Sequence, residues 1–202
     1  MAEPARVPYQ AAARSLLRDT VVGAVDDLVR ARGWASTTMA DVARAAGVSR
    51  QTLYNEFGSR PSLIQAYVAR EVETMIGEVS EAVRAHADDA HAALREAFAL
   101  FLRLASDEPV VRTIVAGGAD GAVGAELITA LTDVGQALAA TRIAVLVPEV
   151  WPQITDDDAQ LLAGSLVRLA ISHALLPTAD PDEIAAGVGR MFSPFVEQIL
   201  AV

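Results

Sequence analysis

Residues 47–57, GVSRQTLYNEF, gather polar side chains that suit contact with DNA. Arginine can pair with guanine through two hydrogen bonds, and glutamine and asparagine can pair with adenine in the same way. Hydroxyl groups and the N–H groups at a helix N-terminus bind phosphates. Residues 49–55 offer nearly all of these groups within two helical turns. They favour a surface that faces duplex DNA, although an ordinary polar surface helix could have the same composition.

The residues around this segment predict how it is held. Leu53 and Phe57 are four apart, so they share one face of a helix and predict a buried anchor. Ser49 is a typical N-cap for this helix, and Thr38 is a typical N-cap for a short helix before it. Gly47 ends that earlier helix. Two short helices joined by a turn that contains glycine predict a helix-turn-helix.

The whole chain is predicted to be all-α. Its 202 residues are 52% hydrophobic but only 5% aromatic, so alanine and aliphatic residues, which favour helices, must form the core. Apolar periodicity and capping residues predict long helices after the helix-turn-helix. The expected ranges are 10–32, 39–46, 50–57, 60–87, 89–105, a short helix from 109, a long helix to about 146, then 155–176 and a last helix from 181. Residues 117–124, GGADGAVG, are predicted to be a flexible loop, and residues 148–152 a connector.

Composition narrows the possible functions. The chain has no cysteine, so it has no disulfide framework, thiolate metal site or cysteine nucleophile. Its three histidines lack partners at metal-ligand spacing, so neither a metal nor a cofactor is expected. We expect no secretory signal and no membrane span, because charges interrupt each apolar run before about 18 residues. The expected compartment is the cytoplasm.

The charge is distributed unevenly along the chain. Residues 1–60 contain eight arginines and six acidic residues, which gives +2, whereas residues 61–202 contain eight arginines and twenty acidic residues, which gives −12. Such asymmetry indicates a segment that faces nucleic acid joined to a different module. The acidic module would be repelled by DNA, which leaves the N-terminal segment to approach it.

A set of motifs over about residues 10–70 resembles the DNA-binding segment of the TetR family of bacterial repressors. The matching motifs are Gly33-Trp34, Thr37-Thr38, Ala46-Gly47-Val48-Ser49, Leu53-Tyr54, Phe57, Ser59-Arg60 and Leu63. The sequence departs from the family at two positions, because Glu56 replaces the usual histidine and Arg60 replaces the usual lysine. Glu56 could turn toward Arg60 or Arg44, or it could repel wrong phosphate registers.

The resemblance implies roles for individual residues and a domain organisation. The implied base-contacting residues are Gln51, Thr52 and Asn55, and the implied phosphate-contacting residues are Thr38, Ser49, Arg50, Tyr54 and Arg60. The expected organisation is a disordered arm at 1–9, a helix-turn-helix domain at 10–60, and an effector-binding and dimerisation domain at 61–202. Family members bind double-stranded operator DNA as homodimers, with two recognition helices in successive major grooves.

The second domain offers two apolar sets, each of which could equally be core packing within one chain. Candidates for an effector pocket are Met75, Phe98, Phe101, Leu102, Arg112, Leu131, Val134, Gln136, Leu138, Trp151 and His173. Candidates for a four-helix dimer interface are Leu162, Leu166, Leu169, Val188, Met191, Phe192 and Phe195. Polar residues near the pocket set are few, and the segment TLYNEFGSR is similar to a TetR subgroup associated with alkane-oxidation and lipid-export genes. We therefore expect a lipophilic effector, such as a fatty acid or lipid-like molecule.

The favoured function is therefore a repressor that a small lipophilic effector releases from operator DNA, and not an enzyme. A second hypothesis is a helical small-molecule-binding protein or enzyme whose helix-turn-helix no longer binds DNA. Glu56 supports this second hypothesis, because a carboxylate near DNA phosphates weakens binding.

Overall fold

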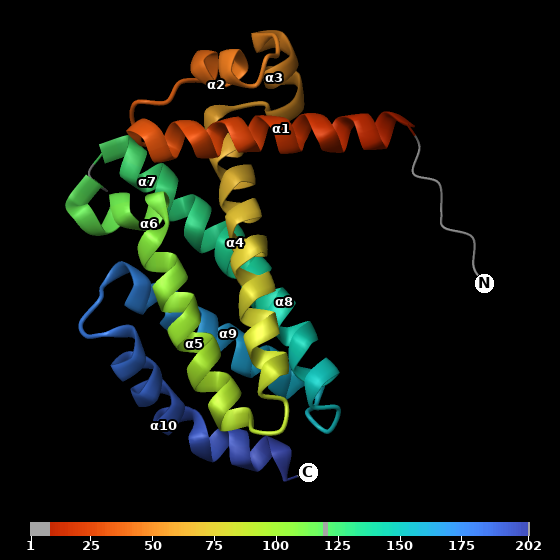
Figure 1. Cartoon of the computed structure of the whole chain (residues 1–202), viewed down its shortest axis with the longest axis vertical. Coiled ribbons are helices and arrows are strands. Elements are labelled where there is room, and N and C mark those ends of the chain that lie inside the picture. Colours follow the sequence, from red (N-terminus) through yellow and green to blue (C-terminus); the bar gives the residue numbers. More distant parts are fainter. Residues whose placement is uncertain (1–8, 119–120, 202) are drawn as a thin grey trace. The chain divides into compact units, whose positions relative to one another are not determined.

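The computed structural model describes residues 9–118 and 121–201, and its regular elements within those ranges are all helical. The all-α prediction is therefore confirmed. The helices, labelled in Figure 1, are α1 (Tyr9–Arg32), α2 (Met39–Ala45), α3 (Arg50–Phe57), α4 (Arg60–Ala85), α5 (Ala90–Asp107), α6 (Pro109–Thr113), the π-helical η1 (Ile114–Gly118), α7 (Gly121–Thr129), the π-helical η2 (Ala130–Gly135), α8 (Gln136–Val150), α9 (Asp156–Leu175) and α10 (Pro181–Leu200).

The chain divides into two compact units, residues 1–67 and 68–202. The sequence prediction placed the boundary at 60/61, where α4 begins. The first turns of α4 belong instead to the first unit, because Leu63, Ile64 and Tyr67 are fully buried there. The Tyr67 hydroxyl also donates a 3.0 Å hydrogen bond to Asp26 of α1. Residues 1–8 of the expected disordered arm lie outside the described residues, and Tyr9 already belongs to α1.

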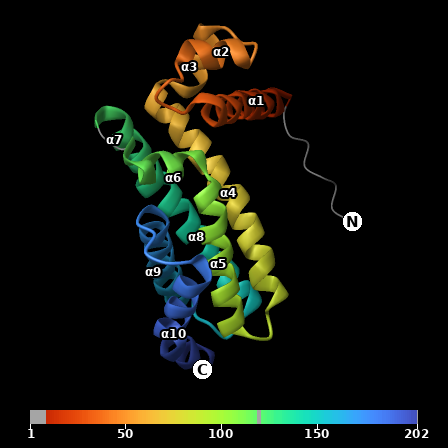
Figure 2. The same cartoon turned by 60° about the vertical axis from the view of Figure 1, so that its left-hand side comes forward.

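In the first unit, α2 and α3 lie together beside α1 (Figures 1 and 2). Side-chain caps define where both short helices begin. Thr38 and Asp41 form a complete capping box at α2, and the Ser49 hydroxyl accepts a 3.0 Å hydrogen bond from the N–H of Thr52 at α3. The turn between the two helices contains Gly47, whose φ of +67° is a conformation that glycine adopts without strain.

Trp34 fills the space where α1 ends. It is 1% exposed, and the guanidinium of Arg60 lies 4.2 Å from the centroid of its ring. Arg60 also donates hydrogen bonds to the carbonyls of Trp34, at 2.8 Å, and Thr37, at 3.3 Å. The first residue of α4 thereby fastens the loop that follows α1, by a cation–π contact and by satisfying backbone acceptors.

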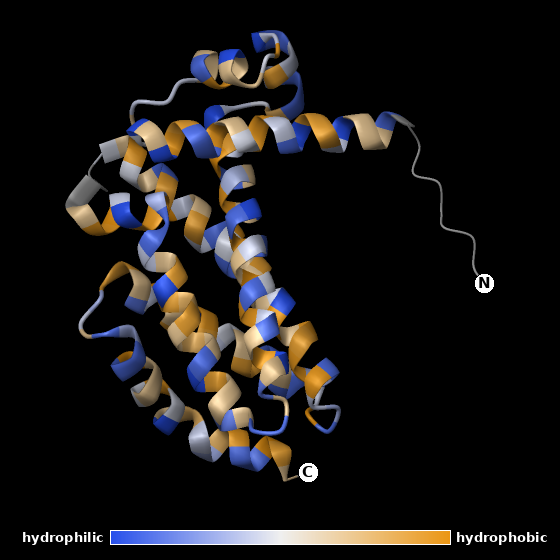
Figure 3. Cartoon of the chain, in the orientation of Figure 1, coloured by the Kyte–Doolittle hydropathy of each residue, from blue (hydrophilic) through white to orange (hydrophobic). Residues whose placement is uncertain are grey.

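In the second unit, α8 packs along α9 and α5 packs along α10. Figure 3 shows apolar bands, coloured orange, along these helices. Phe98 and Leu102 of α5 are buried with Val188 of α10 in one cluster, and Val147 of α8 is buried with Leu162 of α9 in another. Leu166 of α9 and Phe192 of α10 pack against both clusters, so the four helices share an apolar interior.

Two sequence predictions about this unit are wrong. The expected loop at 117–124 contains the start of α7, which begins at Gly121; residues 119–120 lie outside the described part. Helix α7 forms despite its glycines because Leu127 is fully buried, so tertiary packing outweighs low helix propensity. Helix α8 continues to Val150, beyond the expected end at 146, and includes Pro148 in its last turn.

Candidate DNA-binding surface and apolar cavity

Helix α3 is anchored on one face and exposed on the other. Leu53 is 1% exposed and Phe57 is 7% exposed, so the two apolar residues fix the rotation of the helix about its axis. That rotation leaves Arg50, Gln51 and Asn55 exposed. The side-chain amide of Gln51 donates a 3.0 Å hydrogen bond to Asn55, which orders the two residues side by side, one turn apart.

The three hydroxyl residues assigned to phosphates have different surroundings. Tyr54 is 47% exposed, which is unusual for a large aromatic side chain. Thr38 and Ser49 are also exposed, but both hydroxyls take part in caps. The Ser49 hydroxyl lies 2.8 Å from that of Thr52, so these two groups form a short polar row at the start of α3.

Asp41 stabilises the end of α2 that carries Thr38. Hydrogen bonds from the Thr38 hydroxyl and backbone N–H lower the pKa of the Asp41 carboxyl, and Arg32 and Arg44 lower it further. Arg32 pairs with this carboxylate at 2.9 Å, and Arg44 pairs with it one turn away. Asp41 therefore stays ionised at neutral pH and holds two basic groups near Thr38.

Glu56 pairs with neither of the partners that the sequence suggested. Its carboxylate accepts hydrogen bonds from Arg14 at 2.8 Å and from Arg18 at 2.8 Å, both on α1, rather than from Arg44 or Arg60. Burial alone would raise the pKa of Glu56, but the hydrogen bonds from Arg18 and Arg14 outweigh burial and lower it. Arg60 is engaged instead with Trp34 and Thr37, as described above.

The second unit contains a cavity of about 140 Å³ among α4, α5, α6, η2, α8, α9 and α10. Each of its lining residues is apolar or glycine, so it contains no charged group and no side-chain hydrogen-bond donor, except the indole of Trp151. The Trp151 N–H donates to the carbonyl of Ala87 at 2.8 Å and is thus already satisfied. An engineered cavity of similar size and lining stays dry and binds benzene.

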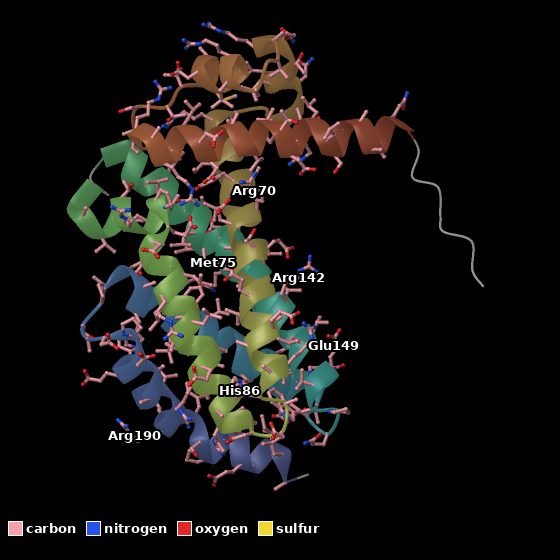
Figure 4. All side chains as sticks on the ribbon, viewed as in Figure 1. Arg70, Met75, His86, Arg142, Glu149 and Arg190 are labelled. Atoms are coloured by element: carbon pink, nitrogen blue, oxygen red, sulfur yellow. The ribbon has the colours of Figure 1, made fainter. Side chains whose placement is uncertain are left out.

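The structure brings some of the expected pocket residues to this cavity and not others. The lining includes Met75, which is labelled in Figure 4, together with Phe98, Phe101, Leu131 and Trp151. The lining does not include Leu102, Arg112, Val134, Gln136, Leu138 and His173.

Leu102, Arg112 and His173 illustrate why some predicted residues do not line the cavity. Leu102 is buried in the core between α5 and α10, on a different face of α5 from Phe101. Arg112 is exposed on α6. His173 does contact the lining, because its ring lies edge-on to Phe98 with centroids 6.3 Å apart. The lining residues that the sequence did not predict are aliphatic residues of α4, α8 and α9 together with small residues such as Ala93, Ala97 and Ala139, and their only signal was helical periodicity.

The residues expected at a dimer interface divide between the interior and the surface of this chain. Leu162 and Val188 are buried within the unit, and Leu166 lines the cavity. Leu169, Phe192 and Phe195 are half-buried against core clusters. Met191 of α10 is 59% exposed, and Leu161 of α9 is 58% exposed. An interface on α9 and α10 would therefore use the outer residues of the predicted stripes.

The described residues contain no group of three or more His, Asp or Glu side chains that could hold a metal ion. One continuous helical stretch, Gly121–Val150, is long and apolar enough to span a membrane by length and composition alone. Several of its apolar residues line the cavity, among them Leu131, Ile143 and Leu146. Of its most apolar 18-residue window, 28% is buried within the chain.

Two family matches cover most of the chain. Residues 24–67 match the family described as "Bacterial regulatory proteins, tetR family", and residues 89–194 match "Bacterial Tetracyclin repressor, C-terminal domain". The chain belongs to the TetR family. The HTH-type transcriptional regulator AlkX of Mycobacterium tuberculosis is 37% identical over 195 residues, which is 96% of this chain and 91% of that protein. The resemblance seen in the sequence is confirmed, and these TetR relatives are transcriptional regulators rather than enzymes.

Solved structures agree with this assignment. The TetR family repressor AlkX from Dietzia sp. strain DQ12-45-1b, "implicated in biodegradation of n-alkanes", is 35% identical with a TM-score of 0.77, over 89% of this chain and 97% of that chain. A TetR-family regulator from Pectobacterium atrosepticum is 20% identical with a TM-score of 0.61, over 95% of this chain and 97% of that chain. At that identity the second likeness shows the fold alone.

Proposed function

We propose that this TetR-family regulator is a cytoplasmic repressor that a lipophilic effector, such as a fatty acid or lipid-like molecule, releases from operator DNA. The observation that carries the effector class is the apolar lining of the cavity. A polar metabolite would lose its hydrogen bonds to water there and gain none, which costs several kcal/mol. An acyl or alkyl chain gains about 25 cal/mol for each Å² of apolar surface that it buries.

The size of the cavity supports a mechanism for release. At about 140 Å³ it matches a ligand about as large as benzene, which is smaller than an acyl chain. In this proposal, a longer chain enters the site by moving the lining helices apart. An effector that binds the expanded form better than the compact form shifts the population toward the expanded form. We assign DNA binding to the compact form.

The lining also determines where a carboxylate could be placed. A buried unpaired carboxylate is unfavourable, and no basic side chain lines the cavity. A fatty acid would therefore bind with its chain inside and its charged group at solvent. Neutral alkyl compounds do not have this restriction, and AlkX from Dietzia is itself implicated in the biodegradation of n-alkanes.

On the DNA side, we assign base contacts to Gln51, Thr52 and Asn55. Support comes from the anchored rotation of α3, which leaves Gln51 and Asn55 exposed beside each other. Phosphate contacts are assigned to Thr38, Ser49, Arg50 and Tyr54. Arg60 is also a phosphate candidate, but its contacts with Trp34 and Thr37 give it a second task in fixing the start of α4.

We further propose a homodimer that forms through the outer faces of α9 and α10. Leu161 of α9 and Met191 of α10 are exposed and would contribute apolar surface to this interface. Two copies would place two α3 helices in successive major grooves, about 34–36 Å apart.

Isothermal titration calorimetry tests the effector class. The purified protein is titrated with a neutral alkyl compound, a fatty acid of equal chain length and a polar aromatic metabolite. We expect the two alkyl compounds to bind with a negative heat-capacity change, which marks apolar burial. Tight binding of the polar compound with no affinity for either alkyl compound would contradict the proposal.

A further inference from the structure

The amino-terminal half of α1 is an exposed extension of the first unit. Residues 10–16 are all exposed, and the first fully buried residue of the helix is Val21. Leu16 is 68% exposed, so packing does not hold this half in place. The ion pairs of Arg14 and Arg18 with Glu56 connect this half to α3, the helix assigned to the major groove.

The cluster of Arg14, Arg18 and Glu56 differs in geometry from an ordinary ion pair on a protein surface. The side chain of Glu56 is only 10% exposed, and it accepts hydrogen bonds from two guanidinium groups that lie one helical turn apart on α1. Arg14 uses Nε for both of its bonds to Glu56, at 2.9 Å and 2.8 Å. Arg18 uses Nη1 for Glu56, and its guanidinium lies 4.9 Å from the centroid of the Phe57 ring.

These contacts leave positive charge available beside α3. Two arginines share one carboxylate, so the cluster carries a net charge of +1. The side chain of Arg14 is 65% exposed, and that of Arg18 is 44% exposed. Because the Glu56 bonds of Arg14 use Nε, the two terminal nitrogens of this guanidinium remain, within the part of the chain that the structure describes, for another acceptor. A planar guanidinium edge suits a phosphate through paired hydrogen bonds.

We propose that Arg14 binds the DNA phosphate backbone next to the half-site, with Glu56 and Arg18 holding it in position. The inference rests on the DNA-binding function and adds a phosphate contact from α1 to those of α2, α3 and α4. Arg18 acts as a positioning residue, because it covers Phe57 and shares the carboxylate. The buried carboxylate then aids DNA binding through the arginine that it orients.

The distinguishing property of a phosphate contact is its dependence on salt. Each phosphate that is neutralised contributes about 0.9 to the slope of log K against log salt concentration. If a dimer binds two half-sites, loss of Arg14 removes two contacts, and the slope should become shallower by about 1.8. Phosphate contacts carry no direct sequence information, so the loss should be similar for different duplexes.

The experiment uses the full-length protein and a duplex that the protein itself selects from a random-sequence pool. Fluorescence anisotropy gives the affinity between about 0.05 and 0.3 M salt for wild type, Arg14→Ala and Arg103→Ala. Arg103 is the matched control, since it is an exposed arginine that pairs with Asp182 in the second unit. We expect Arg14→Ala to bind about tenfold or more weakly near 0.1 M salt with a shallower slope, and Arg103→Ala to match wild type.

Glu56→Gln tests the positioning part of the proposal. This change removes a negative charge near DNA, so charge alone predicts tighter binding. If Glu56 orients Arg14, binding instead weakens by a few-fold. Tighter binding would overturn the orienting role, because it would mean that the ion pairs with Glu56 only compete with DNA for Arg14 and Arg18.

The outcomes separate the inference from the DNA-binding function itself. If wild type selects no duplex, the DNA-binding function fails before Arg14 is tested. If wild type binds and Arg14→Ala keeps the wild-type salt slope, Arg14 is not a phosphate contact, whatever its affinity. Thermal melting of each variant verifies folding, and the exposed position of Arg14 makes wild-type-like melting the expected result.

Discussion

The proposed recognition surface and the proposed effector cavity of this regulator are built in opposite ways. The surface of α3 is a short run of neighbouring residues, held by Ser49, Leu53 and Phe57, with its polar groups facing outward. The cavity draws its lining from seven helical segments and the α8–α9 connector, between residues 72 and 199, and that lining contains almost no polar group. Reading DNA requires hydrogen-bonding groups in fixed positions, whereas holding an alkyl chain requires only apolar surface and space.

The largest expected effect comes from the anchor of α3. Leu53→Ala should lower the free energy of unfolding by about 2–5 kcal/mol, because it removes a fully buried leucine and leaves a cavity. DNA binding should be lost with it, since α3 loses its fixed rotation. Chemical denaturation and anisotropy measure both quantities.

The control for this change is Leu16→Ala, which truncates an exposed leucine of the same unit. Its effect on stability should stay within about 0.5 kcal/mol. Equal costs for the two substitutions would contradict the anchored arrangement of α3.

Gln51→Ala addresses the polar face of α3. If Gln51 reads one base pair, the variant should lose about 1–3 kcal/mol of discrimination at that position and keep its preferences elsewhere. Binding to a set of operators that differ at single base pairs measures this loss. Tyr54→Phe is the comparison, because removal of a phosphate contact should weaken all operators alike. Unchanged preference at each position would refute the assignment of Gln51.

Ala139→Leu addresses the cavity. Ala139 is 7% exposed and lines the cavity from α8, so a larger side chain occupies space that the effector needs. We expect the affinity for an alkyl effector to fall by about tenfold, which is about 1.4 kcal/mol. Binding of DNA without effector should be unaffected. The matched control is Ala137→Leu, which enlarges an exposed alanine of the same helix.

The smallest expected effect concerns pH. Arg18 and Arg14 lower the pKa of Glu56 despite its burial, so the folded state binds this proton less readily than the unfolded chain. The resulting stabilisation is present above the ordinary glutamate pKa of 4.5 and is lost as the pH falls through the lower, folded-state pKa. Acid titration of wild type and Glu56→Gln should therefore show a steeper loss of stability below about pH 4.5 in wild type. Parallel curves would contradict this ionic coupling.

The contrast between the two regions also explains how much the sequence could predict. The caps at Thr38 and Ser49 and the Leu53–Phe57 pair depend on neighbours within a few residues, so local patterns were sufficient. The partners of Glu56 are 38 and 42 residues away on α1, and no local pattern gives that pairing. Arg14 and Arg18 do lie four apart, but this spacing alone does not name a partner.

Prediction of the cavity was limited by helix rotation and by small residues. Phe101 lines the cavity, whereas its neighbour Leu102 is buried in the core on another face, and apolar character does not distinguish them. Alanines such as Ala97 line the cavity because their small size creates the space. The glycine-rich run before Glu126 predicted a loop, yet burial of Leu127 supports a helix from Gly121.

The central claim is that filling an apolar cavity releases this regulator from DNA, and one titration tests it directly. The preformed complex of the full-length protein with its selected operator is titrated with a fatty acid and followed by anisotropy, in parallel with Ala139→Leu and Ala137→Leu. We predict release from wild type and Ala137→Leu at similar concentrations, and release from Ala139→Leu only at about tenfold higher concentration. Release of all three proteins at the same fatty-acid concentration would contradict this claim. Failure of any alkyl compound to release the wild-type protein would contradict it as well.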